Sequence, residues 1–497
     1  MTISSGDPQG SLDLLNQAQS LAVQMGNQEQ KASALHLTGL AYERLNKPED
    51  ALRSYQQALE IRRQIGQNRG IAASLNGLAK VQAALGKNKD ALANFQESLQ
   101  LRRDIGDQSG LGDTLIDLAN FYDDRGDHDQ ALKMYKESLQ IQRDLNSDSM
   151  QATCLNNIGV IYFEKAQYED ARTYYDRALQ IREKLNAPQS IVETVYNLAE
   201  TSVRMGQYEQ AVAQYMRALD LFRKVNDTRG AAVASYTLGV MFDYQGRFGA
   251  ALNSKLEALK TFQELKDRTS WMADIQSGYG EGLILAGRGD EAKPYLDSAL
   301  NLARELKNDG MIAQVLAIQG DAAYHRGDAK AARPLYDQAL QAATRSKEPD
   351  KVLRAKVRLA RLDVAEGRAQ QAIGSLRLLM RQADEQGVPN VSVECDILLA
   401  EAMIQARDNA HAREELDRAL SRADKLGLKP LSAKAHYLLA TIFRTSGNQT
   451  DAQQHYRNTL DLLDSMRKES GAEKILQRSD FKSMYDEATR WSQVAKS

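Results

Sequence analysis

Cysteine, proline and tryptophan are all scarce in this sequence of 497 residues, with 2, 8 and 2 copies respectively. Two cysteines, Cys154 and Cys395, are too few for a disulfide scaffold or a cysteine-based zinc site, so we expect both to be small buried side chains. The few prolines leave long stretches open to helix, and Ala, Leu, Gln, Glu, Lys and Arg outnumber the β-branched residues. The composition therefore predicts a helical protein.

An excess of charge of one sign and long hydrophobic runs are also missing. Lys and Arg number 64 and Asp and Glu number 66, so the net charge is only -2, which argues against a general nucleic-acid binder. No stretch approaches the roughly 18 apolar residues of a membrane span. The first residues lack the basic and apolar regions of a signal peptide. We therefore expect a cytoplasmic protein whose partners are neither nucleic acid nor membrane.

One alanine position recurs along nearly the whole chain. Neighbouring copies are 40 residues apart, except for one step of 41 between Ala251 and Ala292. A Gly or Ala lies twelve residues before each copy, and a Tyr, Phe or Leu lies four residues after it in every copy but one, which has Lys255. The eleven copies are Ala51, Ala91, Ala131, Ala171, Ala211, Ala251, Ala292, Ala332, Ala372, Ala412 and Ala452.

Each repeat contains two stretches of helical periodicity separated by a polar turn. In residues 155–185, Leu155, Ile158 and Tyr162 fall on one helical face, and Ala171 and Tyr175 begin the apolar stripe of a second helix. The small residues allow the two helices to approach closely, and the bulky residue fills the space beside them. Most repeats also carry a glycine near the end of the first helix, which suits a left-handed turn. A single hairpin cannot bury both apolar faces, so we expect the copies to stack.

At these positions the sequence resembles the tetratricopeptide repeat (TPR) family, whose usual unit is roughly 34 residues. The longer unit, with the junctions at 106–110 and 226–230, is similar to kinesin light chains and to the cell-polarity adaptors that bind heterotrimeric G-protein partners. HEAT and armadillo repeats share a period of about 40 residues, but the order of small and aromatic residues is that of TPR. The resemblance implies an all-α fold, a right-handed α-solenoid of tandem antiparallel helix hairpins.

The repeat pattern divides the chain into residues 1–26, a half-repeat with only a second helix, residues 27–470, eleven tandem repeats, and residues 471–497, a capping helix. The half-repeat has two interpretations. Either the chain is part of a longer protein, or Leu14, Leu15, Ala18 and Leu21 pack on the next repeat and leave one flank partly bare. Such a bare flank can also dock end to end on another copy. At the other end, a helix after Ser479 has an apolar stripe that includes Phe481 and Trp491, and we expect it to cover the last repeat.

No group of residues predicts catalysis, a cofactor or a metal ion. The six histidines belong to separate repeats, although His436 and His455 can approach each other across one hairpin. The glycines of residues 277–282 lie inside an expected first helix instead of following a strand, so they do not predict a dinucleotide loop. The sequence therefore predicts that the protein is not an enzyme.

The TPR resemblance implies that the first helices line a concave groove. The inward positions of the third to sixth repeats are acidic, aromatic and rich in Asn, which favours an extended peptide with Lys or Arg. The ninth repeat has the opposite charge, and Arg354, Arg358 and Arg361 predict a carboxylate or anion site. The family's carboxylate clamp for chaperone tails is not found in three successive repeats. The predicted groove residues are Asp113, Asp117, Asn120, Asp123, Asn156, Asn157, Phe163, Glu193, Tyr196, Asn197, Glu200, Tyr236, Asp243 and Tyr244.

These features favour a non-catalytic scaffold for protein–protein interaction, which binds a peptide segment of a partner in its groove. Two alternatives stay open. The chain can be the regulatory or sensor region of a larger bacterial signalling protein, such as a kinase, a cyclase or a transcription regulator. It can also be a self-assembling solenoid.

Overall fold

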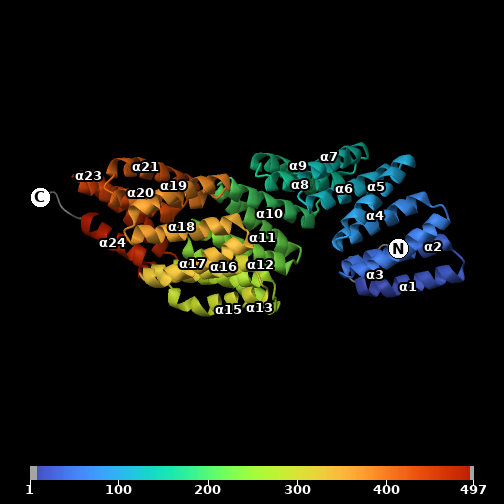
Figure 1. Ribbon diagram of the computed structural model, residues 1–497, viewed down its shortest axis with the longest axis horizontal. Helices are drawn as coiled ribbons and strands as arrows, with labels where there is room; N and C mark the ends of the chain where they lie inside the picture. Colours follow the sequence, from blue (N-terminus) through green and yellow to red (C-terminus); the bar gives the residue numbers. More distant parts are fainter. Residues whose placement is uncertain (1–7, 493–497) are drawn as a thin grey trace. The chain divides into compact units, whose positions relative to one another are not determined.

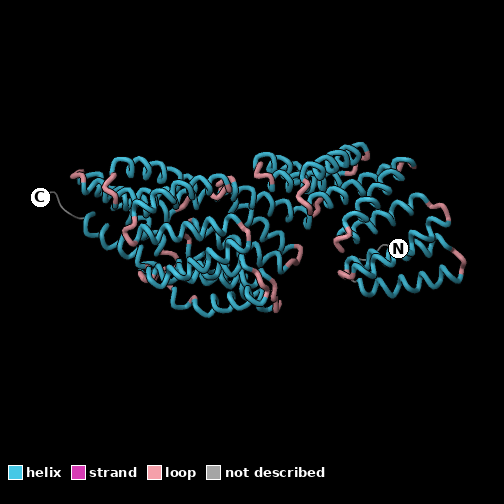
Figure 2. The backbone as a smooth tube through the Cα atoms, in the orientation of Figure 1, coloured by secondary structure: helices cyan, strands magenta, loops and turns pink. Residues whose placement is uncertain are grey.

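The computed structural model describes residues 8–492, which form 24 α-helices and two short 3₁₀ helices and contain no strand (Figures 1 and 2). The ends of the predicted half-repeat and capping region, residues 1–7 and 493–497, lie outside the described residues. Helix α1 (Pro8–Gln24) comes first, and eleven hairpins follow, each with an even-numbered first helix and an odd-numbered second helix. The all-α prediction is confirmed.

The helices have nearly uniform lengths. The first helices are α2 (Gln28–Arg44), α4 (Asn68–Ala84), α6 (Gln108–Asp123), α8 (Asp148–Glu164), α10 (Pro188–Arg204), α12 (Thr228–Tyr244), α14 (Ser270–Leu285), α16 (Asp309–His325), α18 (Pro349–Ala365), α20 (Pro389–Gln405) and α22 (Lys429–Thr445). The second helices are α3 (Pro48–Gln64), α5 (Asn88–Asp104), α7 (His128–Asp144), α9 (Tyr168–Lys184), α11 (Tyr208–Lys224), α13 (Phe248–Glu264), α15 (Lys293–Glu305), α17 (Ala329–Ser346), α19 (Ala369–Glu385), α21 (Asn409–Leu426) and α23 (Gln449–Arg467). The 3₁₀ helices η1 (Gly289–Glu291) and η2 (Ile475–Gln477) precede α15 and α24 (Ser479–Ser492).

The turns between helices contain a residue in the left-handed region about every 20 residues. Gly86, after a first helix, has φ 72°, as the sequence predicted. The same turn also follows the second helices, where Gly106 has φ 69°. Ala166 adopts φ 56° although it is not a glycine, so the turn geometry is set by helix packing even where the residue is unfavourable.

The residue pattern of the repeat explains how each hairpin packs. The recurring alanine is at most 1% exposed in all eleven copies, and the bulky residue after it is buried. A Cβ atom added at Gly159 would lie 2.7 Å from the ring of Tyr175, and one at Gly320 would lie 2.4 Å from the ring of Tyr336. The small residue on the first helix therefore makes room for the aromatic ring of the second, as the sequence predicted.

The buried tyrosines also bind polar groups of their own hairpin. The hydroxyl of Tyr55 donates to Glu43, and the hydroxyl of Tyr336 donates to Asp321 at 2.8 Å. In the sixth repeat Lys255, fully buried, takes the place of the aromatic residue and forms an ion pair with Asp243. The one polar exception in the sequence pattern is therefore a buried charge with a partner on the first helix.

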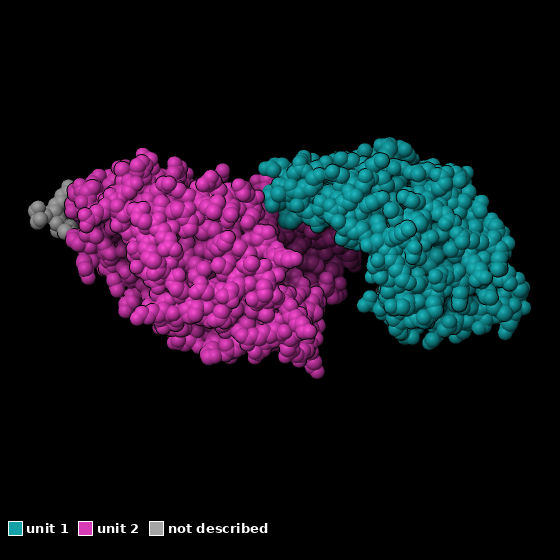
Figure 3. All heavy atoms as spheres, in the orientation of Figure 1, with its two compact units in different colours: residues 1–187 teal, residues 188–497 magenta. Residues whose placement is uncertain are grey.

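The contacts divide the chain into two compact units, Met1–Ala187 (unit 1) and Pro188–Ser497 (unit 2), which Figure 3 colours separately. In unit 1 the hydrophobic clusters join helices of the same hairpin and of neighbouring hairpins, as in a simple solenoid. The repeat pattern continues through Ala187 and Pro188 without interruption, so it did not predict this boundary.

In unit 2 the last helices contact the first ones. The hydroxyl of Tyr208 lies 3.4 Å from Asn390 Oδ1, and the backbone N–H of Gly249 donates to Glu469 at 3.1 Å. These pairs are 182 and 220 residues apart in the sequence. The hairpins of unit 2 therefore curve until the late helices contact the early ones, and the first helices face a common interior.

In unit 1 we expect His36 to make the fold sensitive to acid. His36 packs on the ring of Tyr55, and burial, followed by the charge of Arg62, lowers its pKa from 6.5 to about 4. Between these pH values the unfolded chain binds a proton that the folded chain does not, so stability falls as the pH falls from 6.5 to 4. The loss attributable to this group is at most about 3 kcal/mol.

Urea unfolding followed by circular dichroism at pH 7 and pH 5 tests this prediction, with the variant His36→Leu compared with the wild type. The variant should lose less stability on acidification than the wild type. His411→Gln is the matched control, because His411 is exposed and its pKa is raised by Asp408. An equal loss of stability in the wild type and in His36→Leu would contradict the assignment.

Candidate functional site

Unit 2 contains a cavity of about 450 Å³. Its walls come mainly from the first helices α12, α14, α16, α18, α20 and α22, together with the start of α13 and with α24. Apolar side chains such as Phe248, Ile318 and Leu398 alternate on these walls with charged ones. The volume falls within the roughly 300–1,000 Å³ typical of ligand pockets. This cavity is the candidate functional site.

The predicted arginine cluster lies on the cavity wall, where two of its three members are already neutralised. Arg358 Nε lies 2.8 Å from Asp321, and Arg361 contacts the same carboxylate. Asp321 is 7% exposed, and despite its burial the two guanidinium groups hold its pKa well below the usual range. Among the described residues no carboxylate lies within ion-pair distance of Arg354. Arg354 is therefore the member of the predicted cluster that is available to a ligand.

The acidic residues on the cavity wall include Asp243 and Glu281. Asp243 is buried beside Lys255, and burial raises its pKa to about 6 despite that lysine. One of its carboxylate oxygens, Oδ1, has no hydrogen-bond partner. The charge of Glu281 also acts on Asp243, and the described part of the chain offers Glu281 no ion-pair or hydrogen-bond partner of its own. The cavity thus has an acidic side and, at Arg354, a basic group.

The C-terminal segment closes one part of the cavity. Phe481 and Met484 of α24 line it, and Phe481 lies 6.5 Å from Phe248, measured between ring centroids. Asp480 Oδ1 lies 3.3 Å from His325 Nδ1, and Arg478 bonds both to Asp480 and to the backbone oxygen of Leu285. Helix α24 contacts α22 and α23, the last hairpin, and it also reaches helices from the start of unit 2.

The structure does not bring all the predicted groove residues together. Tyr236, Asp243 and Tyr244 line the unit 2 cavity with the arginines of the ninth repeat, which the sequence treated as a separate site. Glu193, Tyr196 and Asn197 line a second hollow of about 430 Å³ in unit 2. Glu200 is half-buried and accepts from the hydroxyl of Tyr215. Seven residues belong to unit 1: Asp113, Asp117, Asn120, Asp123, Asn156, Asn157 and Phe163.

The asparagines of unit 1 are engaged within the protein. Asn156 is 1% exposed and accepts from Arg182 at 3.3 Å, so it does not reach the concave surface that the repeat position implied. Asn120 accepts from the hydroxyl of Tyr135, and Asn157 lies 3.4 Å from the same hydroxyl. These asparagines therefore also bind groups of the protein itself, and the use of Asn120 and Asn157 for an extended peptide stays a prediction.

The same repeat position could have identified the charged residues of the cavity that the sequence analysis missed. The inward position eleven residues before each recurring alanine is Glu281, Asp321, Arg361 and Glu401 in the seventh to tenth repeats. Of these, Glu281, Arg361 and Glu401 line the cavity, and Asp321 binds its arginines. The predicted positions came from the third to sixth repeats and from the arginines of the ninth, so they include Asp243 and Arg354 but not Glu281 or Glu401.

The family comparison agrees with the hairpin architecture. Residues 158–468 match the family described as MalT-like TPR region, and a tetratricopeptide repeat family matches residues 3–64, 51–104, 70–144 and 110–184. The chain belongs to the tetratricopeptide repeat family. The matched TPR families do not single out the kinesin light chain type, which stays a prediction. No curated protein matches the sequence.

Three solved structures are similar to this TPR protein. A Rap protein complexed with competence and sporulation factor is 17% identical, with a TM-score of 0.52 over 72% of this chain and 99% of that one. The quorum sensor NprR from B. thuringiensis in its apo form is 19% identical (TM-score 0.46, 59% and 82% covered), and aspartyl phosphate phosphatase F from Bacillus subtilis is 13% identical (TM-score 0.48, 69% and 95% covered). The first likeness shows that the fold is shared. No helix in the described part of the chain is long and apolar enough to cross a membrane.

Proposed function

We propose that this TPR protein is a non-catalytic interaction protein that binds a short peptide segment of a partner in the unit 2 cavity. One observation carries the proposal. Glu281 and Arg354, which are opposite in charge, line the same cavity without an ion-pair partner among the described residues. Several other charges on the wall are paired, as in Arg358 with Asp321 and Lys434 with Glu401. Unpaired charges in a partly buried cavity favour a ligand that supplies the missing partners.

The chemistry of the wall indicates what such a ligand contains. Glu281 and the unpartnered oxygen of Asp243 favour a Lys or Arg side chain or an amino terminus. The guanidinium of Arg354 favours a carboxylate, in a bidentate geometry. Phe248, Ile318 and Leu398 provide apolar surface between them. A short peptide with one basic and one acidic group satisfies all three requirements.

A similar fold has been observed with a bound factor, since one of the similar structures is a complex of a Rap protein with competence and sporulation factor. That observation supports ligand binding by a chain of this architecture. In the present chain the preformed cavity lowers the ordering cost on the receptor side. The proposal uses Tyr236, Asp243 and Tyr244 of the predicted groove and does not involve the groove residues of unit 1.

Binding can be tested with the full chain and a library of short peptides, screened by native mass spectrometry and followed by calorimetry on the hits. We expect Glu281→Gln to weaken peptides that contain Lys or Arg about tenfold, which is about 1.4 kcal/mol. Arg354→Gln should instead weaken peptides that contain a free carboxylate. Each variant then reports on one end of the ligand.

Two exposed residues of unit 2 provide matched controls. Glu264→Gln and Lys356→Gln remove the same charges from the outside of α13 and α18, and both should leave peptide affinity unchanged. If peptides bind equally well to the Glu281 and Arg354 variants and to the controls, the cavity is not the binding site.

A further inference from the structure

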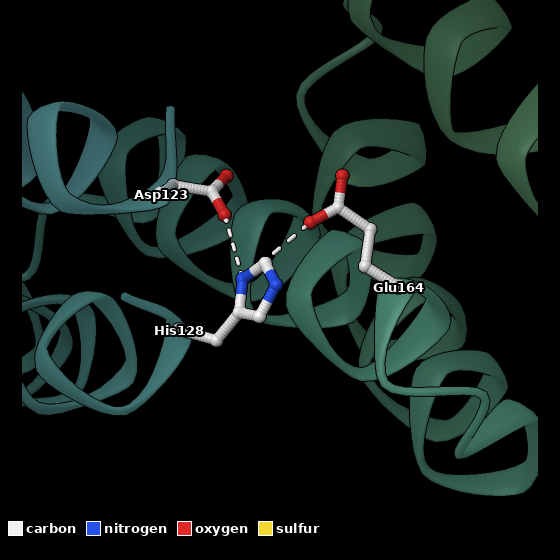
Figure 4. A group of neighbouring side chains, drawn as sticks. All are labelled: Asp123, His128 and Glu164. Carbon is white, nitrogen blue, oxygen red and sulfur yellow. Dashed lines mark hydrogen bonds and ion pairs between the residues drawn. The ribbon is translucent and has the colours of Figure 1, made fainter. Parts of the chain in front are cut away.

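Three potential metal ligands from three different helices converge in unit 1. Asp123 ends α6, His128 begins α7 and Glu164 ends α8, and both carboxylates point toward the imidazole ring (Figure 4). His128 Nδ1 lies 3.2 Å from Asp123 Oδ1 and 3.6 Å from Glu164 Oε2. One donor atom from each residue lies within 4.8 Å of the other two.

The protein itself does not balance the charge of this group. A ring nitrogen carries at most one proton, so His128 Nδ1 can donate to only one of the two carboxylates that face it. Lys165, the neighbouring base, is paired with Asp129 at 2.8 Å. The arrangement therefore has an excess of negative charge around a nitrogen donor, which a divalent cation would neutralise.

The distances fit a particular class of ion. In a tetrahedral site with bonds of about 2.0–2.1 Å, neighbouring ligand atoms lie about 3.3 Å apart, close to the separations from His128 Nδ1. One imidazole nitrogen with two carboxylate oxygens suits Zn²⁺, Co²⁺ and related transition ions, whereas Ca²⁺ and Mg²⁺ prefer oxygen donors alone. The side chains of Asp123, His128 and Glu164 are 20%, 30% and 45% exposed, so water can reach the group and complete the coordination.

The geometry points to a binding site for a transition-metal ion of the Zn²⁺ type, formed by Asp123, His128 and Glu164. The ion would join the hairpin of α6 and α7 to the end of α8 in the next hairpin. Because the folded chain would bind the ion and the separated helices would not, metal binding stabilises unit 1. This site is independent of the peptide cavity in unit 2.

The test is a titration of the full, metal-free chain without an affinity tag, by calorimetry with Zn²⁺ and by visible absorption with Co²⁺. We expect one equivalent of metal per chain and a cobalt spectrum typical of tetrahedral coordination. His128→Ala and Glu164→Gln should each lower the affinity at least tenfold. Circular dichroism of the same samples shows whether the variants fold. Glu164→Gln should disturb the fold least, because Glu164 is the most exposed of the three ligands.

His411→Ala is the matched control. His411 Nδ1 lies 2.8 Å from Asp408 and forms the same kind of His–Asp pair, but no second carboxylate among the described residues lies within ion-pair distance of it, so metal affinity should not change. The rival site is the pair His436 and His455, whose Nδ1 atoms are 2.9 Å apart. The inference is overturned if no saturable binding occurs, if binding survives in His128→Ala and Glu164→Gln, or if His455→Ala abolishes it.

Discussion

Replacing Lys255 by alanine should lower the free energy of unfolding of unit 2 by about 3 to 5 kcal/mol. Lys255 is fully buried, and its ammonium group is the ion-pair partner of Asp243, whose side chain is 6% exposed. Removal of the lysine leaves a buried carboxylate without its counter-charge and creates a cavity between α12 and α13. The two tryptophans, Trp271 and Trp491, both belong to unit 2, so urea unfolding followed by tryptophan fluorescence measures this unit.

The variant Lys255→Tyr is the informative comparison. In the first hairpin Tyr55 occupies the equivalent position, and its hydroxyl donates to Glu43, which lies twelve residues earlier, just as Asp243 lies twelve residues before Lys255. A tyrosine should therefore fill the space and donate to Asp243, and it should cost much less stability than alanine. Equal losses in the two variants would show that the position does not follow the tyrosine pattern of the other repeats.

Replacing Asp321 by alanine should have an effect of similar size, a loss of about 3 to 5 kcal/mol in unit 2. The carboxylate binds Arg358 and Arg361 and also accepts from the hydroxyl of Tyr336. Without it, Arg358 would lose its only ion-pair partner among the described residues, and Arg361 would keep only Glu394, at 3.8 Å, although the two side chains are only 19% and 16% exposed. Tryptophan fluorescence during urea unfolding again provides the measurement.

Asp363 offers a matched control for Asp321, because it also lies between two arginines. Its partners, Arg333 and Arg368, are 32% and 41% exposed and both also pair with Glu366, so solvent and this second carboxylate can screen them when Asp363 is removed. Asp363→Ala should therefore cost about 1 kcal/mol or less. The interpretation fails if the two aspartate variants lose the same stability, since the burial of the arginines and the loss of their counter-ion would then not set the cost.

The fold could be predicted from the sequence because each hairpin is determined by residues close together in the chain. The small residue, the recurring alanine and the bulky residue four positions later fix how two adjacent helices pack, and Gly159 against Tyr175 illustrates the contact. The same local reasoning predicted the turns after the first helices and the approach of His436 to His455. Lys255 departs from the repeat pattern in the sequence, but its partner, Asp243, could be identified only in the structure.

The closure of unit 2 could not be predicted in this way. It results from small rotations between successive hairpins, which add up along the unit. Their sum brings Tyr208 into contact with Asn390 and Gly249 into contact with Glu469. No residue within a single repeat determines this accumulated rotation. For the same reason the sequence treated Asp243 and Arg354 as parts of separate sites, whereas both line one cavity. The sequence also did not predict that Asp123, His128 and Glu164 lie together, because Glu164 comes from a different repeat than the other two.

Photo-crosslinking of a bound peptide tests the central claim most directly. A short peptide with one lysine, one free carboxylate and a photoreactive group is bound to the full chain and irradiated, and the modified residues are identified by mass spectrometry. The proposal predicts saturable labelling of the inner walls formed by α14, α18 and α20, near Glu281 and Arg354. Labelling confined to the outer second helices or to unit 1, or labelling that does not saturate, would contradict it.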